Sequence, residues 1–230
     1  MNMAGSWPEG RFPDATPGQS LTQSLVKDDT SKNKIILHQS FYARDTLTVA
    51  EHLLGQQLVH IDGENTTTGR IVETEAYLQQ DPAAHSFHGK TGSNSVLFGP
   101  PGHAHIFFIY GKHWCLNVVT GQKDQRGAVL LRALEPVDGI PVMQERRGTT
   151  AIRLLCSGPG RLTQALAITG EFNGAPLFSG PLLIRSTDSL PASGHSAEAE
   201  IVQTTRIGIS KAKDQPYRFY MKGNPHISRR

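Results

Sequence analysis

One stretch, from Gly69 to Tyr77, constrains the fold of this chain most. It reads Gly-Arg-Ile-Val-Glu-Thr-Glu-Ala-Tyr, and its first half has the composition of a β-strand. Its second half places carboxylates and a phenol where a strand would be expected to carry apolar residues. Because side chains alternate between the two faces of a strand, Glu75 and Tyr77 should be neighbours on one surface. Glu73 shares that face and is expected to form a structural ion pair, so the pattern indicates a strand that carries a functional site.

The remaining hydrophobic pattern predicts a mixed α+β domain. Asp45 is a candidate N-cap for a short amphipathic helix that ends at Gly55. A strand over 57–61 and a turn at 62–63 make a hairpin with the Gly69 strand. The further segments predicted are strands over 103–110, 113–119, 127–134, 182–186, 205–209 and 217–221, and helices over 136–147 and 157–168. We therefore expect a single compact domain with a curved, mostly antiparallel sheet and surrounding helices.

Length and composition divide the 230 residues into a tail and one domain. Residues 1–33 are rich in Gly, Pro, Ser, Thr and Asp, which predicts a disordered N-terminal tail without a site, and the domain is expected over 34–230. No apolar run approaches the ~18 residues that a membrane span needs, and the N-terminus lacks the apolar core of a signal peptide. We expect a monomer without membrane contact, cytoplasmic, or nuclear in a eukaryotic source.

The charges and cysteines narrow the class of partner. The formal net charge is only +3, but basic residues outnumber acidic ones in the last part of the chain. A basic C-terminal surface suits a polyanion, although a merely solvated charged edge gives the same pattern. Cys115 and Cys156 are isolated, so buried free thiols are expected rather than zinc ligands or a disulfide.

A long polar loop and a hairpin follow the Gly69 strand. Residues 78–101 are polar and Gly-rich and include His85; loops of this length in compact domains are usually functional or disordered. The strands over 103–110 and 113–119 are joined at Gly111 and Lys112, which predicts a hairpin with Tyr110 near its tip. An aromatic ring at a hairpin tip is poorly placed for burial and suits a wedge that enters DNA.

Several short motifs, in this order, resemble the alkyladenine (3-methyladenine) DNA glycosylases. Together they cover nearly all of the chain after the N-terminal tail, and their shared order makes a chance match very improbable. The matching segments are Gly69–Tyr77, Ala83–Ser86, Tyr110–Gly111, Cys115–Asn117, Leu130–Pro136, Gly158–Leu162 and Arg206–Ile209.

This resemblance implies a monofunctional base-excision repair enzyme. Such an enzyme flips an alkylated purine out of double-stranded DNA and hydrolyses its N-glycosidic bond. By carry-over, Glu75 activates the water and Arg132 helps to hold the water and the acidic side chain. Tyr77 and His85 line the base pocket, and Asn117 screens bases by their edge.

The resemblance also implies a protruding β-hairpin that enters the minor groove of DNA. Tyr110 would fill the gap left by the flipped base, and Gly111 and Lys112 would contact the DNA beside it. The chain departs from the family's best-known pattern at Phe107, where a second pocket tyrosine is expected. Stacking against a base should survive there, whereas a hydrogen bond from the hydroxyl group is lost.

The same residues also permit structural explanations. Glu75 could be a surface carboxylate, Phe107 could be core, Arg132 could form a purely structural ion pair, and Asn117 could bond only to the backbone. Five histidines between 85 and 113 raise the question of a metal site, but no metal-binding spacing accompanies them, so neither a metal nor a cofactor is expected. A nucleic-acid clamp without chemistry remains the alternative to the enzyme, and such a clamp would need neither Glu75 nor Arg132.

Overall fold

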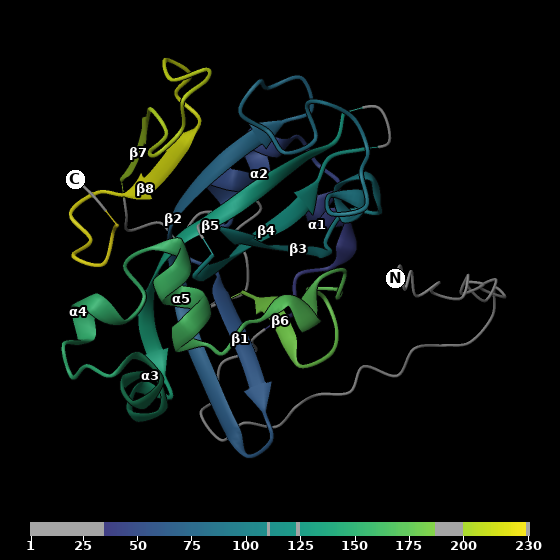
Figure 1. Ribbon diagram of the computed structural model, residues 1–230. Coiled ribbons are helices and arrows are strands. Elements are labelled where there is room, and N and C mark those ends of the chain that lie inside the picture. The colour runs from purple at the N-terminus through teal and green to yellow at the C-terminus, as the bar shows by residue number, and fades with distance from the viewer. Residues whose placement is uncertain (1–34, 110, 123–124, 187–199, 229–230) are drawn as a thin grey trace, which may run out of the picture. The chain divides into compact units, whose positions relative to one another are not determined.

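A curled antiparallel sheet forms the centre of the domain in the computed structural model, which describes residues 35–109, 111–122, 125–186 and 200–228 (Figure 1). The sheet order is β3-β4-β5-β2-β1-β6, and β8 pairs with both β2 and β7. The strands are β1 (Gln57–Asp62), β2 (Asn65–Leu78), β3 (Ala104–Ile109), β4 (His113–Thr120), β5 (Gly127–Asp138), β6 (Leu182–Arg185), β7 (Ile201–Thr204) and β8 (Arg218–Met221). The strand that carries the Gly69–Tyr77 motif, β2, is thus the central one.

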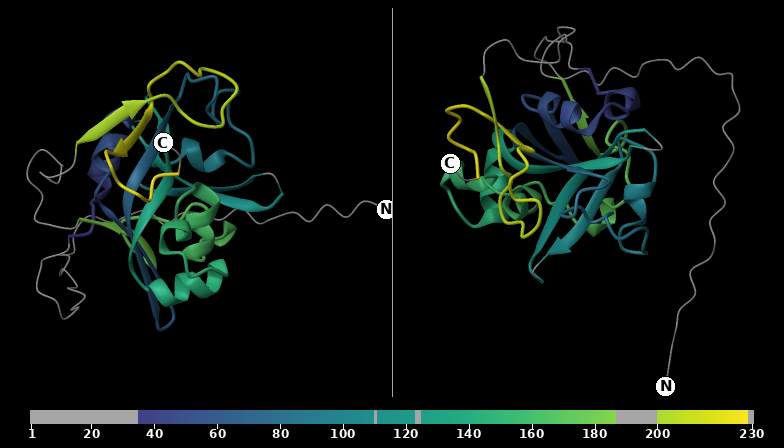
Figure 2. Two further views of the ribbon diagram at one scale, coloured as in Figure 1. Left: turned by 90° about the vertical axis from the view of Figure 1, so that its left-hand side faces the viewer. Right: turned by 90° about the horizontal axis from the view of Figure 1, so that it is seen from above.

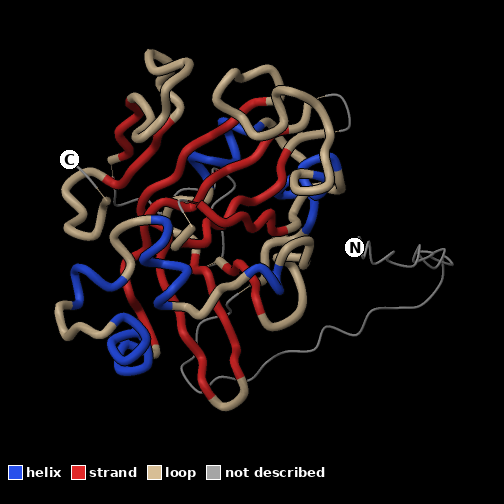
Figure 3. Tube along the Cα trace, in the orientation of Figure 1, coloured by secondary structure: helices blue, strands red, loops and turns tan. Residues whose placement is uncertain are grey.

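Helices cover both faces of this sheet. They are α1 (Gln39–Tyr42), α2 (Thr46–His52), α3 (Ile140–Arg147), α4 (Ile152–Leu155) and α5 (Pro159–Ala165), with short 3-10 turns at η1 (Ser95–Phe98) and η2 (Gly170–Phe172). In the view of Figure 1, α2 lies behind the sheet and α5 in front of it, and the turned views of Figure 2 show the sheet between these layers. Figure 3 shows that strands and loops make up most of the domain. Both layers contribute to one apolar core, for example Val49 from α2 and Leu162 from α5.

Contacts with α2 and with β5 fix the position of β2. Thr74 donates a hydrogen bond to the carbonyl oxygen of Ala50 in α2, at 2.8 Å, so the face of β2 that carries Thr74 is fixed to the α2 layer. Gly69 is required for the close approach of β5, because a Cβ at this position would lie 2.8 Å from the Cβ of Leu134. The strands can pack this tightly only where one of them lacks a side chain.

The α+β class and most predicted elements are confirmed. Asp45 caps α2 by accepting hydrogen bonds from the backbone N–H groups of Leu47 and Thr48. The two predicted hairpins pair as expected, with Asp62 opposite Asn65 and Ile109 opposite His113. The predicted wedge residue Tyr110 and the tail over 1–33 lie outside the described residues, so the intercalating hairpin and the disordered tail stay predictions.

One predicted element begins at the wrong residue, and another is of the wrong type. The helix predicted over 136–147 begins only at Ile140, because Pro136 and Asp138 still pair with β2 as the end of β5. The segment 205–209 is a loop rather than a strand, because its Ile207 N–H group binds a side chain of β2 instead of a neighbouring strand. Both errors come from long-range pairing that local composition does not reveal.

Candidate active site

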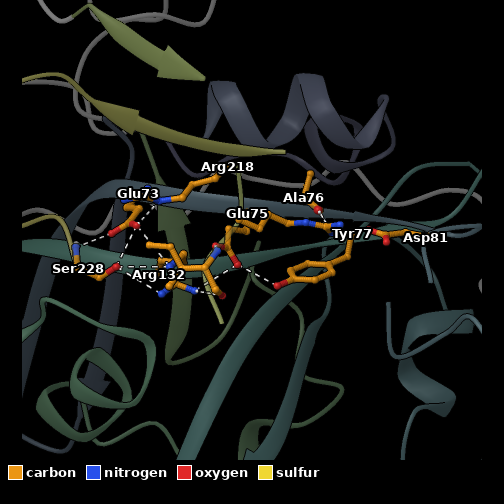
Figure 4. Close-up of polar contacts among 10 residues, drawn as sticks. Glu73, Glu75, Ala76, Tyr77, Asp81, Arg132, Arg218 and Ser228 are labelled. Atoms are coloured by element: carbon orange, nitrogen blue, oxygen red, sulfur yellow. Dashed lines mark hydrogen bonds and ion pairs between the residues drawn. The ribbon is translucent and has the colours of Figure 1, made fainter. Parts of the chain in front are cut away.

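Glu75 is the centre of a buried group of polar contacts on β2 (Figure 4). Its side chain is 0% exposed. One carboxylate oxygen, Oε2, accepts a hydrogen bond from the Tyr77 hydroxyl at 2.8 Å and lies 3.2 Å from the Arg132 guanidinium. The other, Oε1, accepts the backbone N–H of Ile207 at 2.8 Å. The predicted pairing of Glu75 with Tyr77 and Arg132 is thus present.

Tyr77 is fixed as a hydrogen-bond donor to this carboxylate. Burial, and then the negative charge of Glu75, raises the pKa of the Tyr77 phenol. The phenol therefore keeps its proton at neutral pH and donates a hydrogen bond to Glu75.

Glu73 forms a second carboxylate cluster on the same strand. It accepts hydrogen bonds from Arg218 at 2.7 Å and from the backbone N–H and the hydroxyl of Ser228, and it pairs with Arg132 at 3.3 Å. These contacts tie β8 and the C-terminal segment to β2. The expectation that Glu73 forms a structural ion pair agrees with this geometry.

Arg132 reaches both carboxylates because the β2–β5 ladder is irregular at this point. Glu73 is paired with Ala133 and Thr74 with Leu131, so the register passes over Arg132. An unpaired extra residue of this kind is a β-bulge, which re-aims side chains and is common beside functional sites. The irregularity therefore accounts for a guanidinium inside an otherwise apolar strand.

A cavity of about 290 Å³ opens beside the Glu75 cluster. It is formed where β2, β3, β4 and β5 meet the loops after β2 and before β8. Five of the predicted site residues line it, together with Ile207; the six are Tyr77, His85, Phe107, Asn117, Arg132 and Ile207. Glu75 itself lies behind this wall, and each of its three hydrogen-bonding or ionic partners belongs to the wall.

Aromatic rings form one side of the cavity. The rings of His85 and Phe107 meet edge to face, with centroids 4.2 Å apart, and His105 is stacked near Phe107 at 5.5 Å. Burial lowers the pKa of His85, and burial followed by the charge of His85 lowers the pKa of His105 to about 4. Both imidazoles are therefore neutral at neutral pH. His85 lines the cavity and suits a wall against a flat cation, whereas His105 does not line it. The sequence alone suggested His105 only as one of the crowded histidines; its stacking on Phe107 follows from their positions two residues apart on β3.

Asn117 reaches the cavity from β4, where it lies opposite His105 on β3. Its side-chain oxygen is buried and has no hydrogen-bond partner among the described residues. A buried amide oxygen without a partner is costly, so the geometry favours a ligand as the missing donor.

Cys115, on the same strand as Asn117, also lines the cavity; burial raises the pKa of its thiol to about 11. Cys115 and Cys156 are free and buried, as expected.

The C-terminal cations are less exposed than the sequence suggested. Arg206 and Arg218 are buried in ion pairs with Asp81 and Glu73, and Lys222 pairs with Glu200. The prediction that these residues form a basic surface is therefore wrong for the two arginines, because buried carboxylates neutralise them. Lys211 and Lys213 remain exposed, as does Lys112 at the hairpin.

The hairpin end lies beside a second, wider groove of about 830 Å³. Gly111 has a φ of 64°, in the left-handed region that favours glycine. The groove shares His85 and Phe107 with the cavity and is lined in addition by Trp114 and Lys211. A surface thus leads from the hairpin to the mouth of the cavity.

The described part of the chain contains no group of three or more His, Cys, Asp or Glu side chains that could hold a metal ion. Several of the histidines between 85 and 113 instead pack against other rings or lie within hydrogen-bonding distance of the backbone. His103, for example, packs edge to face against Phe178.

None of the helices among the described residues is long and apolar enough to cross a membrane.

Comparison with known proteins gives consistent matches. The family model for methylpurine-DNA glycosylase matches residues 40–225. A protein of Methanoculleus marisnigri named "Putative 3-methyladenine DNA glycosylase" is 57% identical over 195 residues, which cover 84% of this chain and 99% of the relative. Proteins with the same name from Carboxydothermus hydrogenoformans and Agrobacterium fabrum are 50% and 48% identical, over 85% and 84% of this chain and 100% and 92% of the relatives.

Proposed function

The chain belongs to the methylpurine-DNA glycosylase family, and on this premise we propose that it excises alkylated purines of the 3-methyladenine type from double-stranded DNA. The reaction is hydrolysis of an N-glycosyl bond, the first step of base excision repair. The observation that carries this proposal is the buried Glu75 carboxylate, which is held by three groups that line a cavity.

In the proposed mechanism Glu75 activates the attacking water. The bond between C1′ of the sugar and the purine nitrogen breaks, its electron pair leaves with the base, and the sugar becomes cationic. The water oxygen then bonds to C1′, and Glu75 accepts the water proton. The negative charge of Glu75 also stabilises the sugar cation.

Tyr77 and Arg132 hold the carboxylate in place for this step. Each contacts the same oxygen, Oε2, while Ile207 N–H binds the other. Such fixed donors leave few orientations to the carboxylate and keep it ready for a water at the cavity wall. Arg132 is also the counter-ion that allows Glu75 to be buried as a charge.

The cavity would receive the flipped base. Tyr77, His85 and Phe107 offer aromatic faces, and an alkylated purine is often cationic and always flat. The lowered pKa of His85 keeps its imidazole neutral, so it does not repel such a base. The unpaired oxygen of Asn117 would accept a hydrogen bond from the base edge and so discriminate between bases.

Contact with duplex DNA is assigned to the hairpin and to exposed lysines. Tyr110 would take the place of the flipped base in the stack, with Gly111 and Lys112 against the adjacent backbone. Lys211 and Lys213 would contact phosphates, and binding should then weaken as salt is raised. We propose a monomer that needs no metal or cofactor.

The test is release of base from methylated duplex DNA. The protein should free 3-methyladenine and leave abasic sites that alkali converts into strand breaks, and it should do so in the presence of a chelator. A protein that bound the same DNA without producing abasic sites would be a clamp, and the enzymatic proposal would fail.

A further inference from the structure

Arg206 is buried where three segments of the cavity wall meet. Its side chain is 0% exposed and forms an ion pair with Asp81, whose side chain is 2% exposed. The same nitrogen, Nη1, donates to the carbonyl oxygen of Ala76 at 2.9 Å, and Nη2 donates to that of Ala212 at 3.4 Å. One guanidinium therefore joins the end of β2, the loop after it and the segment before β8.

Each of these segments also carries a part of the site. Tyr77 follows Ala76 on β2, and Ile207 follows Arg206 itself. Asp81 accepts the N–H of Ala83 at 2.9 Å, in the loop that leads to His85. A shift of the guanidinium would thus move both hydrogen-bond donors of Glu75 and one aromatic wall of the cavity.

Arg206 also restrains the Tyr77 ring directly. Its guanidinium carbon lies 4.6 Å from the centroid of Tyr77 and 5.3 Å from that of Tyr217. A planar cation over an aromatic face is attracted by the ring and limits its rotation. The Tyr77 hydroxyl is at the same time 2.8 Å from Glu75, so the position of the ring determines that hydrogen bond.

We propose that Arg206, neutralised by Asp81, is a positioning residue that sets the Tyr77 hydroxyl and the Ile207 N–H on Glu75. This inference rests on the proposed function of Glu75. It also replaces the expectation that Arg206 belongs to a basic surface for a polyanion, because a buried guanidinium that is already paired cannot reach DNA. Its loss should slow excision without weakening the binding of undamaged DNA.

The experiment replaces both charges at once, with Arg206→Gln and Asp81→Asn in one chain. This double variant leaves no buried charge without a partner, and the amide oxygen introduced in place of the Asp81 carboxylate can still accept the Ala83 N–H. Single-turnover excision from methylated duplex should fall about 10- to 100-fold, as expected when hydrogen bonds to a charged group are disturbed. The Kd for lesion-free duplex, and its dependence on salt, should stay within about threefold of wild type.

A control uses another Arg–Asp pair, Arg146 and Asp62, which are 2.8 Å apart, are more exposed than Arg206 and Asp81, and do not line the cavity. The variant Arg146→Gln with Asp62→Asn should excise at the wild-type rate. If the Arg206 double variant does not fold, Arg206→Lys keeps a charge opposite Asp81 but lacks the planar group over Tyr77. A lowered rate at unchanged lesion-free Kd would then support the proposal, and a wild-type rate would overturn it.

The outcomes separate this inference from the proposed function. If wild type frees no base from methylated DNA, the proposed function fails. If wild type is active and the folded Arg206 variant is equally fast, only the positioning role fails. A weaker lesion-free Kd with a wild-type rate at saturating protein would make Arg206 a DNA contact and would also overturn the positioning role.

Discussion

Glu73 and Glu75 lie two positions apart on β2 and share one guanidinium, yet their surroundings differ. Both side chains are 0% exposed, and both pair with Arg132, at 3.3 and 3.2 Å. Glu73 takes its other partners from β8 and the C-terminal segment, at Arg218 and Ser228. Glu75 takes its other partners from Tyr77 and Ile207, which line the cavity.

In the proposed mechanism, this difference separates a structural carboxylate from a reactive one. A buried charge is tolerated only when partners compensate it, and both residues meet that condition. The partners of Glu73 are backbone and side chains that hold the end of the chain on the sheet. The partners of Glu75 line the cavity, and this position is the basis for proposing that its charge takes part in chemistry. Burial and ion pairing alone would not distinguish them.

The largest expected effect comes from Glu75→Gln. The amide keeps the shape and part of the hydrogen bonding but cannot accept the water proton or stabilise the sugar cation. Single-turnover excision should fall by a factor of ~100 to 10,000 or more, since general base catalysis supplies that range and the lost charge adds to it. Release of 3-methyladenine from methylated duplex measures the rate.

Binding and folding are the controls for that variant. The Kd for damaged duplex should stay near the wild-type value, and a melting curve must show that the protein is folded, because Arg132 loses part of its compensation. Excision at nearly the wild-type rate by folded Glu75→Gln would contradict the mechanism.

Glu73→Gln should lower the free energy of unfolding much more than the excision rate, which is the opposite of the effect expected for Glu75→Gln. Arg218 loses the Glu73 carboxylate inside the protein, and breaking one partner of a buried pair typically costs about 3–5 kcal/mol of the free energy of unfolding. Urea denaturation measures this loss. Excision per folded molecule should change only a few-fold, because Arg218 and Ser228, the partners that Glu73 does not share with Glu75, do not line the cavity. A stable protein that had lost excision would show that the two carboxylates act together.

A pair of hydroxyl deletions sharpens the comparison further. Tyr77→Phe removes the donor to Glu75 at 2.8 Å, and Ser228→Ala removes a hydroxyl donor to Glu73 at 2.9 Å. A hydrogen bond to a charged group contributes about 1.5–3 kcal/mol. For Tyr77→Phe the loss should appear mainly as an excision rate about tenfold lower or more. For Ser228→Ala it should appear as a lower free energy of unfolding with the rate unchanged. Equal effects of both variants on the rate would remove the distinction.

Much of the Glu75 side of this comparison could be predicted from sequence. Strand alternation placed Glu75 beside Tyr77, and the cost of burying a lone guanidinium pointed from Arg132 to a carboxylate on the next strand. The structure brings these together with His85, Phe107 and Asn117 around one cavity. Local pattern suffices for Glu75, Tyr77 and Arg132, which lie on adjacent strands. The other three residues were expected from the family resemblance.

The rest could not be predicted, because it depends on contacts distant in sequence. The sequence contains no sign that Ile207 N–H turns to Glu75 or that Arg206 pairs with Asp81, since the segment around 207 has the composition of a strand. Likewise, Pro136 resembles a helix start until its pairing with Gly69 on β2 is known. The β-bulge at Arg132 is also invisible in the pattern, since it arises from the register between two strands.

The smallest expected effect comes from a change at Phe107, on the aromatic wall of the cavity. Phe107→Tyr keeps the aromatic face that meets His85 at 4.2 Å and adds one hydroxyl to a half-buried ring. No described contact joins Phe107 to Glu75 or Glu73, so the rate of 3-methyladenine excision should stay within about threefold of wild type. The relative rates among damaged bases should shift, because the added hydroxyl can form a hydrogen bond to a base edge. Competition between two lesions in one reaction measures that shift, and Phe107→Leu, which loses the ring, should weaken binding of the lesion. If Phe107→Tyr failed to fold, Phe107 would belong to the core. If the variant lowered the single-turnover rate as far as Tyr77→Phe does, the aromatic wall would take part in chemistry. The division between the Glu75 cluster and the base-binding wall would then have to be abandoned.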